Sequence, residues 1–214
     1  MYNDFRSIGQ DAVSILSAAH FANPPHGPPY HVVGQGVFID TGFGRGDSLR
    51  AAVQAGFREM HGIELCPEYY NSLADSDLVA LAATSPIPDA VRIRLWKGTS
   101  PDCLAEMLPK LYGRDVTVWC DAHYDGKPAE LCGKYGQCPL IAELDTIVAA
   151  GLDPTPLIMI DDASVFASTA WWRKYGPRDY DRDQWPTFTL IYDTLKPHGY
   201  RILIDQEIIW CWRP

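Results

Sequence analysis

The chain has 214 residues, of which 47% are hydrophobic, so it can bury one substantial core, and we expect a single α/β domain. Its net charge of −9 argues against nucleic-acid binding, because that affinity depends on neutralising phosphates. No apolar run approaches the roughly 20 residues that cross a bilayer, and the first residues lack the pattern of a secretion signal, so we expect a cytoplasmic protein with no membrane partner. The six cysteines are then expected to be free thiols.

The first 33 residues differ in character from the rest of the chain. They contain a helix-like stretch at 12–16 and a proline-rich stretch at 23–30, which cannot continue a helix. We expect residues 1–33 to form a leader or lid that packs on the core or covers a ligand. The main domain is then expected at residues 34–214.

Nearly continuous apolar runs recur from residue 36 onwards, with helical segments between them. This pattern predicts βαβ units whose parallel strands are buried on both faces. The expected strands are 36–40, 60–64, 91–96, 116–121, 156–161, 199–204 and 207–212. The last two are too close in sequence for a parallel crossover, so they are expected to pair as an antiparallel hairpin. The predicted fold is a seven-stranded, mostly parallel sheet with helices on both faces.

The segment 37–46 is an apolar run that ends at Asp40 and breaks into Gly42, Gly44 and Gly46. Glycines let a backbone approach a ligand closely, and the helix expected after them turns its amide end to the same place. A dinucleotide fingerprint requires a glycine where Asp47 stands, and the Gly-Lys-Ser/Thr sequence of a phosphate-binding loop is absent, so neither site is favoured. A purely structural tight turn is the alternative.

Glu64 follows the next expected strand, where an acid commonly accepts two ribose hydroxyls. Together with Asp40 and the three glycines, it resembles the first two motifs of S-adenosylmethionine-dependent methyltransferases with a Rossmann-like fold. The resemblance implies that the glycine turn, with Thr41, holds the methionine portion of the cofactor and that Glu64 holds its ribose. Where the family often places an acid near the adenine, this chain has Thr99 and Ser100, whose hydroxyls can contact the adenosine or cap the next helix.

Three further acids follow the fourth and fifth expected strands, namely Asp121, Asp161 and Asp162. Ligands of open α/β sheets bind beyond the carboxyl ends of the strands, so these side chains are expected to converge on one crevice. Neighbouring carboxylates repel each other unless they bind a cation or share a proton, and oxygen ligands suit Mg²⁺. We therefore expect a Mg²⁺ ion that orients a substrate hydroxyl and lowers its pKa. For Asp162 the alternative is a cap on the segment that follows.

The same acids, with His123, resemble the metal-dependent O-methyltransferases of the macrocin O-methyltransferase group. The resemblance implies catalytic roles for Asp121 and His123, with His123 as the general base. This chain departs from the family pattern, because only Ala122 separates the two where two residues are usual. The alternative for His123 is a polar loop histidine. The implied function is O-methylation of a small hydroxylated substrate, such as a sugar or a secondary metabolite.

Several alternatives stay open at this point. A zinc site could use Cys120, His123, Cys132 and Cys138, although their spacing fits no standard zinc motif. The enzyme could instead methylate an amine without a metal, or the chain could be a non-catalytic cofactor-binding or assembly protein, and a homo-oligomer is compatible with the sequence. The aromatic segment 171–185 is expected to be a loop near the site, either a partner interface or a platform that stacks on a sugar.

Overall fold

A computed structural model of the protein describes residues 36–76, 91–124, 132–167, 180–205 and 207–214. The expected leader at 1–33 lies outside these residues. Within them, no helix combines the length and the apolar character that a membrane span requires.

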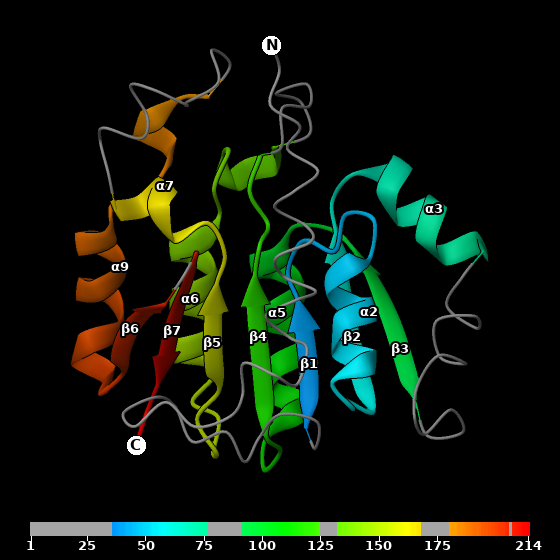
Figure 1. The fold of residues 1–214 in the computed structure, drawn as a ribbon, viewed down its shortest axis with the longest axis horizontal. Helices are drawn as coiled ribbons and strands as arrows, with labels where there is room; N and C mark the ends of the chain where they lie inside the picture. The colour runs from blue at the N-terminus through cyan, green and yellow to red at the C-terminus, as the bar shows by residue number, and fades with distance from the viewer. Residues whose placement is uncertain (1–35, 77–90, 125–131, 168–179, 206) are drawn as a thin grey trace.

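Seven strands form one sheet in the order β3-β2-β1-β4-β5-β7-β6 (Figure 1). Neighbouring strands are parallel except where β7 pairs antiparallel with β5 and with β6. This architecture confirms the predicted α/β fold, including its antiparallel C-terminal hairpin. The strand bounds are β1 (Val37–Asp40), β2 (Glu59–Glu64), β3 (Arg92–Lys97), β4 (Val116–Cys120), β5 (Leu157–Ile160), β6 (Arg201–Asp205) and β7 (Ile208–Trp212).

Helices connect the strands and cover both faces of the sheet (Figure 1). The α-helices are α2 (Asp47–Gln54), α3 (Pro67–Ser76), α5 (Ser100–Met107), α6 (Leu140–Ala149), α7 (Ala163–Ala167) and α9 (Phe188–Leu195). Short 3₁₀ turns lie at η4 (Leu108–Leu111), η6 (Gly133–Tyr135), η7 (Arg182–Gln184) and η8 (Lys196–His198).

The core has two halves, one on each face of the sheet, because successive strand residues point to opposite faces. On one face, Val37 and Ile39 of β1 pack in the same cluster as residues of α5, α6 and α9. On the other, Phe38 packs in a cluster with residues of α2 and α3. Burial on both faces explains why the central strands read as continuous apolar runs.

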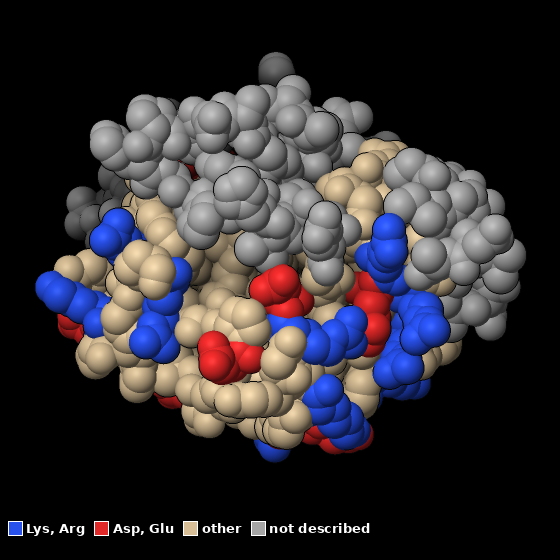
Figure 2. Space-filling view, turned by 90° about the horizontal axis from the view of Figure 1, so that it is seen from below, with Lys and Arg blue, Asp and Glu red and all other residues tan. Residues whose placement is uncertain are grey.

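The parallel strands all end at the same edge of the sheet, so the residues that follow them gather at one end of the molecule. The opposite end, where these strands begin, is seen in Figure 2 and carries basic side chains interspersed with acidic ones. The acids that the sequence analysis singled out either end a strand, in β1 and β2, or directly follow one, after β4 and β5, and therefore lie at the other end.

Candidate active site

The candidate site lies at the carboxyl ends of β1 and β4, the central pair of the sheet. The strand order runs outward in both directions from this pair, with β2 and β3 on one side and β5 on the other. Such a reversal of strand order leaves a crevice between the connecting loops, which is where open α/β sheets bind ligands. Asp40 is the last residue of β1, and Asp121 directly follows β4.

Asp40 is completely buried and shapes the glycine turn. Its Oδ1 accepts a hydrogen bond from the Gly42 amide (3.0 Å), and its Oδ2 accepts one from the Ser48 hydroxyl. Burial raises the pKa of Asp40 to about 8; the bond from Ser48 opposes this shift, and the charge on Asp121 adds to it. The contact of Asp40 with a cofactor stays a prediction, since its carboxyl group is engaged by the turn itself.

The three glycines of the turn meet different surroundings. A β-carbon at Gly42 would lie 2.5 Å from the carbonyl oxygen of Asp121, so this glycine lets the ends of β1 and β4 approach each other. Gly46 has a φ of +82° and is the N-cap of α2. Gly44 has a φ of +48°, and a β-carbon there would meet no atom within 4 Å. Gly44 is thus the position where the turn borders open space and a ligand can approach the backbone.

Glu64 ends β2 beside this turn and is held by two backbone amides. Its Oε2 accepts from the Gly44 amide at 2.9 Å, and its Oε1 accepts from the Cys66 amide at 2.7 Å. Each carboxylate oxygen has two lone pairs, so these bonds orient the side chain without exhausting its capacity to accept. This arrangement fits a carboxylate that binds a pair of vicinal hydroxyls, such as those of a ribose.

The remaining predicted cofactor residues follow β1 and β3. The buried Thr41 hydroxyl accepts from the Asp121 amide at 3.1 Å and so joins the loops after β1 and β4. Thr99 directly precedes α5, and its hydroxyl donates to the Asp102 side chain at 2.5 Å; it makes no side-chain hydrogen bond to a helix amide, so the capping alternative is not met in the structure. Ser100 is buried, and its hydroxyl has no hydrogen-bond partner among the described residues. Cofactor contacts of these three residues stay predictions.

His123 lies between two of the predicted acids. Its Nε2 is 3.0 Å from Oδ1 of Asp121 and 3.1 Å from Oδ2 of Asp162, and its ring centroid is 5.2 Å from that of Trp185. Neither ring nitrogen makes an aligned hydrogen bond within the described part of the chain, so the contacts are ion pairs. Burial alone would lower the pKa of His123, but the two carboxylates outweigh it and raise the pKa well above 6.5. The two carboxylates therefore favour the protonated ring.

Asp161 completes the acidic group beside this ion pair. Burial raises its pKa well above the ordinary value, and the charges of Asp121 and Asp162 add to the shift. Asp162 has a φ of +57°, a conformation that few residues other than glycine adopt, and its amide donates to Oδ1 of Asp161 at 2.8 Å. Backbone strain of this kind tends to occur at functional sites, which agrees with placing the site here.

The described residues do not fit a preformed metal site. No group of three His, Cys, Asp or Glu side chains among them is arranged to hold a metal ion. The imidazole of His123 occupies the place between Asp121 and Asp162 where a cation would balance their charge. The Mg²⁺ ion expected from the sequence stays a prediction.

The alternative zinc set is not brought together. All six cysteines are free, as expected. Cys120, His123, Cys132 and Cys138 all lie within the described residues, where no three such side chains form a group that could hold a metal ion.

One site residue, Glu143, was not singled out by the sequence analysis. It lies in the first turn of α6, is 1% exposed, and its Oε1 has no hydrogen-bond partner among the described residues. Burial raises its pKa to about 7, a shift opposed by the hydroxyls of Ser100 and Thr41 and by the charge on His123. The signal in the sequence was an acid directly beside Leu144, among apolar residues that recur at the spacing of one helix face at positions 140, 141, 144 and 147, where a surface charge does not belong.

The part of the aromatic segment that the structure describes is packed against the site. Trp185 is 4% exposed, stacks on Tyr180 with ring centroids 5.4 Å apart, and donates from its Nε1 to Oε1 of Gln137 at 3.2 Å. Gln137 Oε1 also accepts from the Asp181 amide at 2.8 Å. Trp185 is thus buried against the ring of His123 and is not an exposed platform for stacking on a sugar. Residues 168–179 of the segment lie outside the described residues.

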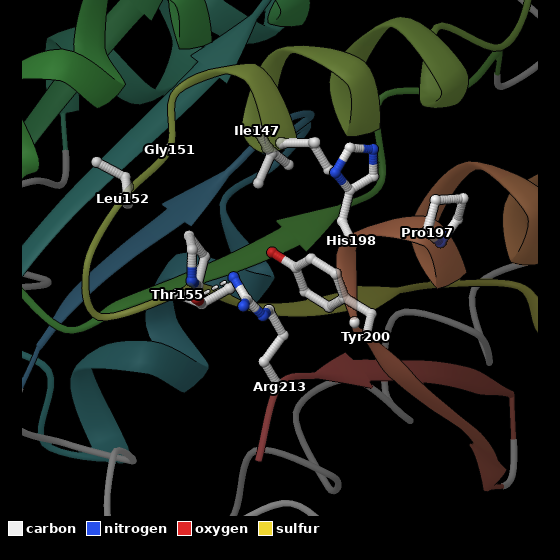
Figure 3. Close-up of a pocket in the computed structure, with 11 residues that line it drawn as sticks. Ile147, Gly151, Leu152, Thr155, Pro197, His198, Tyr200 and Arg213 are labelled. Carbon is white, nitrogen blue, oxygen red and sulfur yellow. Dashed lines mark hydrogen bonds between the residues drawn. The ribbon is translucent and has the colours of Figure 1, made fainter.

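A cavity of about 410 Å³ lies elsewhere, at the end of the sheet where the parallel strands begin (Figure 3). Ile147, Tyr200 and Arg213 contribute to its lining, and Arg213 donates to Thr155 at 3.2 Å. None of the predicted site residues lines this cavity.

Comparison with known proteins bears on the fold. No protein-family model and no curated protein matches the sequence. Solved structures do match. A precorrin-6y C5,15-methyltransferase from Geobacter metallireducens is 14% identical with a TM-score of 0.50, covering 97% of this chain and 88% of its own. The Rossmann-like fold of methyltransferases is the fold of this chain.

Two further methyltransferase structures give the same result. An O-methyltransferase family protein from Burkholderia thailandensis is 11% identical with a TM-score of 0.56, covering 96% of this chain and 56% of its own. A SAM-dependent methyltransferase from Archaeoglobus fulgidus is 16% identical with a TM-score of 0.52, covering 80% of this chain and 63% of its own. At these identities the likeness concerns the fold, and the chemistry must be argued from the site.

Proposed function

We propose that the protein is an S-adenosylmethionine-dependent methyltransferase that transfers a methyl group to an oxygen of a small hydroxylated molecule, such as a sugar or a secondary metabolite. The observation that carries the cofactor assignment is the carboxylate of Glu64. Two backbone amides fix it beside Gly44, where the glycine turn borders open space. The fold of the structural neighbours supports the same assignment.

Within this proposal, Glu64 accepts hydrogen bonds from the ribose hydroxyls and the turn at Gly44 supports the methionine portion. The bound cofactor supplies an electrophilic methyl group on a sulfonium, so the protein has to align the acceptor and take up its proton. These two tasks fall to the group of side chains beyond β4 and β5.

Removal of the acceptor's hydroxyl proton is best assigned to one of the carboxylates beyond β4 and β5. The general-base role implied for His123 requires a neutral ring, whereas two carboxylates favour its cation. We assign to Asp121 or Asp162 the removal of the hydroxyl proton as the oxygen–carbon bond forms and the carbon–sulfur bond breaks. The His123 cation then holds both acids in place and offsets part of their charge.

Metal assistance is a separate proposal, for which the acids are the only support. A metal would have to displace His123 from between Asp121 and Asp162, so the proton transfer above involves no metal. Methyl transfer that continues at full rate in a chelator would overturn the metal proposal alone. Methylation of an amine in place of a hydroxyl would be identified by the labelled product.

Calorimetric titration of S-adenosylmethionine into the purified protein tests the cofactor assignment. Glu64→Gln removes the charge that strengthens the ribose bonds and should weaken binding by about 10- to 100-fold, since hydrogen bonds to charged groups contribute roughly 1.5–3 kcal/mol. Glu106→Gln is the matched control, because Glu106 is exposed on α5 and pairs only with Lys110 among the described residues. Equal affinity in wild type and the Glu64 variant, or no binding of the cofactor at all, would sink the proposal.

A further inference from the structure

β6 is one of the two edge strands of the sheet, and β3 is the other. β6 ends the sheet at one side, β7 pairs with its inner edge, and no strand of the described residues pairs with its outer edge. A strand in this position presents a row of backbone donors and acceptors that can pair with another chain. A partner for β6 must carry side chains that match those of this strand.

Apolar side chains are exposed on this same strand. Leu203 is 38% exposed and Ile204 is 43% exposed. Across the described residues only four large hydrophobic side chains are exposed, and the other two are Tyr112 and Leu190. Two of these four exposed apolar side chains therefore belong to one five-residue strand.

The charges on β6 are arranged symmetrically about Leu203. Arg201 is two residues before it and Asp205 is two residues after it, and both are exposed. Neither side chain has a hydrogen bond or an ion pair within the described ranges, whereas other exposed charges such as Lys110 and Glu106 are paired. Arg201 and Asp205 are thus available to a partner.

An antiparallel copy of β6 matches this pattern. If two strands pair with Leu203 opposite Leu203, then Arg201 of each copy lies opposite Asp205 of the other, which gives two ion pairs related by a twofold axis. Ile202 lies opposite Ile204 in the same register. Directly opposite side chains of antiparallel strands have β-carbons about 4.5–5.5 Å apart, so both kinds of pair make contact. A shift of two residues in either direction would lose both ion pairs and place Leu203 opposite a charged side chain.

We propose that β6 is a dimerisation edge, and that its partner is β6 of a second copy of this chain in the register just described. The two sheets then continue through the twofold axis. β7 and β5 separate β6 from the candidate site at β1 and β4, so the dimer leaves the site accessible. This inference does not depend on the proposed function.

Analytical ultracentrifugation of charge-reversed variants tests the proposal. An interface of this small size should have a dissociation constant in the micromolar range, so the series should extend to roughly 200 µM. Wild type should dimerise. Arg201→Glu and Asp205→Arg each place like charges opposite one another and should be monomeric at concentrations where wild type is dimeric.

The two single variants also test the register when they are mixed. The glutamate introduced at position 201 of one variant then faces the arginine introduced at position 205 of the other. The second pair keeps its natural Asp205 and Arg201, so the mixture should form a heterodimer. The double variant Arg201→Glu/Asp205→Arg should dimerise with itself. Failure of both the mixture and the double variant to dimerise would overturn the register, and with it the proposal.

Two further measurements separate this edge from other surfaces and from loss of folding. Leu203→Lys should dissociate the dimer, whereas Tyr112→Lys, at another exposed apolar side chain, should not. Circular dichroism spectra and melting curves of all variants should match those of wild type. A wild type that is monomeric throughout the series, or a dimer that survives Leu203→Lys, would overturn the proposal.

Discussion

At the residue scale, the candidate site contains carboxyl groups whose surroundings give them different charges near neutral pH. Burial raises the pKa of Asp40 to about 8 and that of Glu143 to about 7. Asp121 and Asp162 favour the protonated form of His123, which lies between them. The site therefore combines Asp40 and Glu143, whose burial favours the protonated acid, with an ion-paired group beyond β4 and β5.

Glu143→Gln should change how stability depends on pH. Glu143 has a pKa of about 7 in the folded protein and an ordinary value of 4.5 in the unfolded chain, so it binds a proton more tightly when folded. Its contribution is complete below pH 4.5 and is lost as the pH rises through 7. Because glutamine resembles the neutral acid, the variant should be as stable as wild type at pH 4.5 and more stable at pH 8, by about 3 kcal/mol at most.

Urea unfolding at the two pH values measures this difference. Glu106→Gln serves as the control, since Glu106 is exposed and pairs with Lys110 on the surface. A stability difference between wild type and the Glu143 variant that is the same at both pH values would show that burial does not neutralise this carboxyl group.

Substitutions at two glycines of the turn should separate packing from ligand binding. Alanine at Gly42 would place a β-carbon against the backbone of Asp121 and Ala122, and overpacking of this kind costs about 1–3 kcal/mol. Alanine at Gly44 meets no atom, so its main cost is the left-handed conformation, about 1–2 kcal/mol. The proposed function adds an effect on cofactor binding at Gly44 alone, because the methyl group of the introduced alanine would occupy space assigned to the cofactor.

Chemical denaturation and cofactor titration together measure the two effects. Gly44→Ala should lower S-adenosylmethionine affinity by more than tenfold in protein that is still folded, while any folded Gly42→Ala should bind more nearly as wild type does. The reverse order of affinities would mean that the turn meets the cofactor at a different glycine.

At the scale of the elements, strand positions could be predicted well and the surroundings of the site could not. Apolar runs mark strands buried on both faces, and the expected ranges agree with β1 to β7 within two residues at each end. Aromatic residues gave a less useful signal, because composition does not say whether a ring faces solvent or the core. Trp185 is buried against His123, since Gln137 accepts hydrogen bonds from both the Trp185 indole and the Asp181 amide. Such long-range pairs have no signature in sequence spacing.

Gln137→Ala should loosen the segment that carries Trp185. The substitution removes the acceptor of two hydrogen bonds, from the buried Trp185 indole and from the part-buried Asp181 amide, and loss of the buried one costs about 1–3 kcal/mol. Amide hydrogen exchange should rise across residues 180–187, and exchange within β1 and β4 should change little. Gln54→Ala, at an exposed position of α2, is the control. Unchanged exchange at 180–187 would show that aromatic packing alone holds the segment.

At the scale of the whole molecule, acids at the ends of four different strands gather at one end of the sheet, and those that are ionised create a negative field there. Asp40 and Glu64 come from β1 and β2, and Asp121 and Asp161 follow β4 and β5. The net charge of −9 has the same sign. A cation that enters this end is attracted by the field, and it also favours ionisation of the neutral carboxyl groups beneath it.

This coupling distinguishes S-adenosylmethionine from its demethylated product, whose sulfur is uncharged. Asp40 is neutral below about pH 8 in the free protein, so a bound sulfonium should lower the pKa of Asp40 and release a proton. The affinity for S-adenosylmethionine should then rise as the pH increases from 6 to 8 and level off above it, by up to tenfold per pH unit at most. Glu143 contributes in the same direction below pH 7.

Calorimetry in buffers of different ionisation enthalpy counts the released protons. The demethylated product should release fewer protons, and Asp40→Asn should reduce the difference between the two ligands. Equal pH dependence for both ligands would show that the sulfonium charge does not reach Asp40, and the cofactor would then have to lie further from the turn than the proposed function requires.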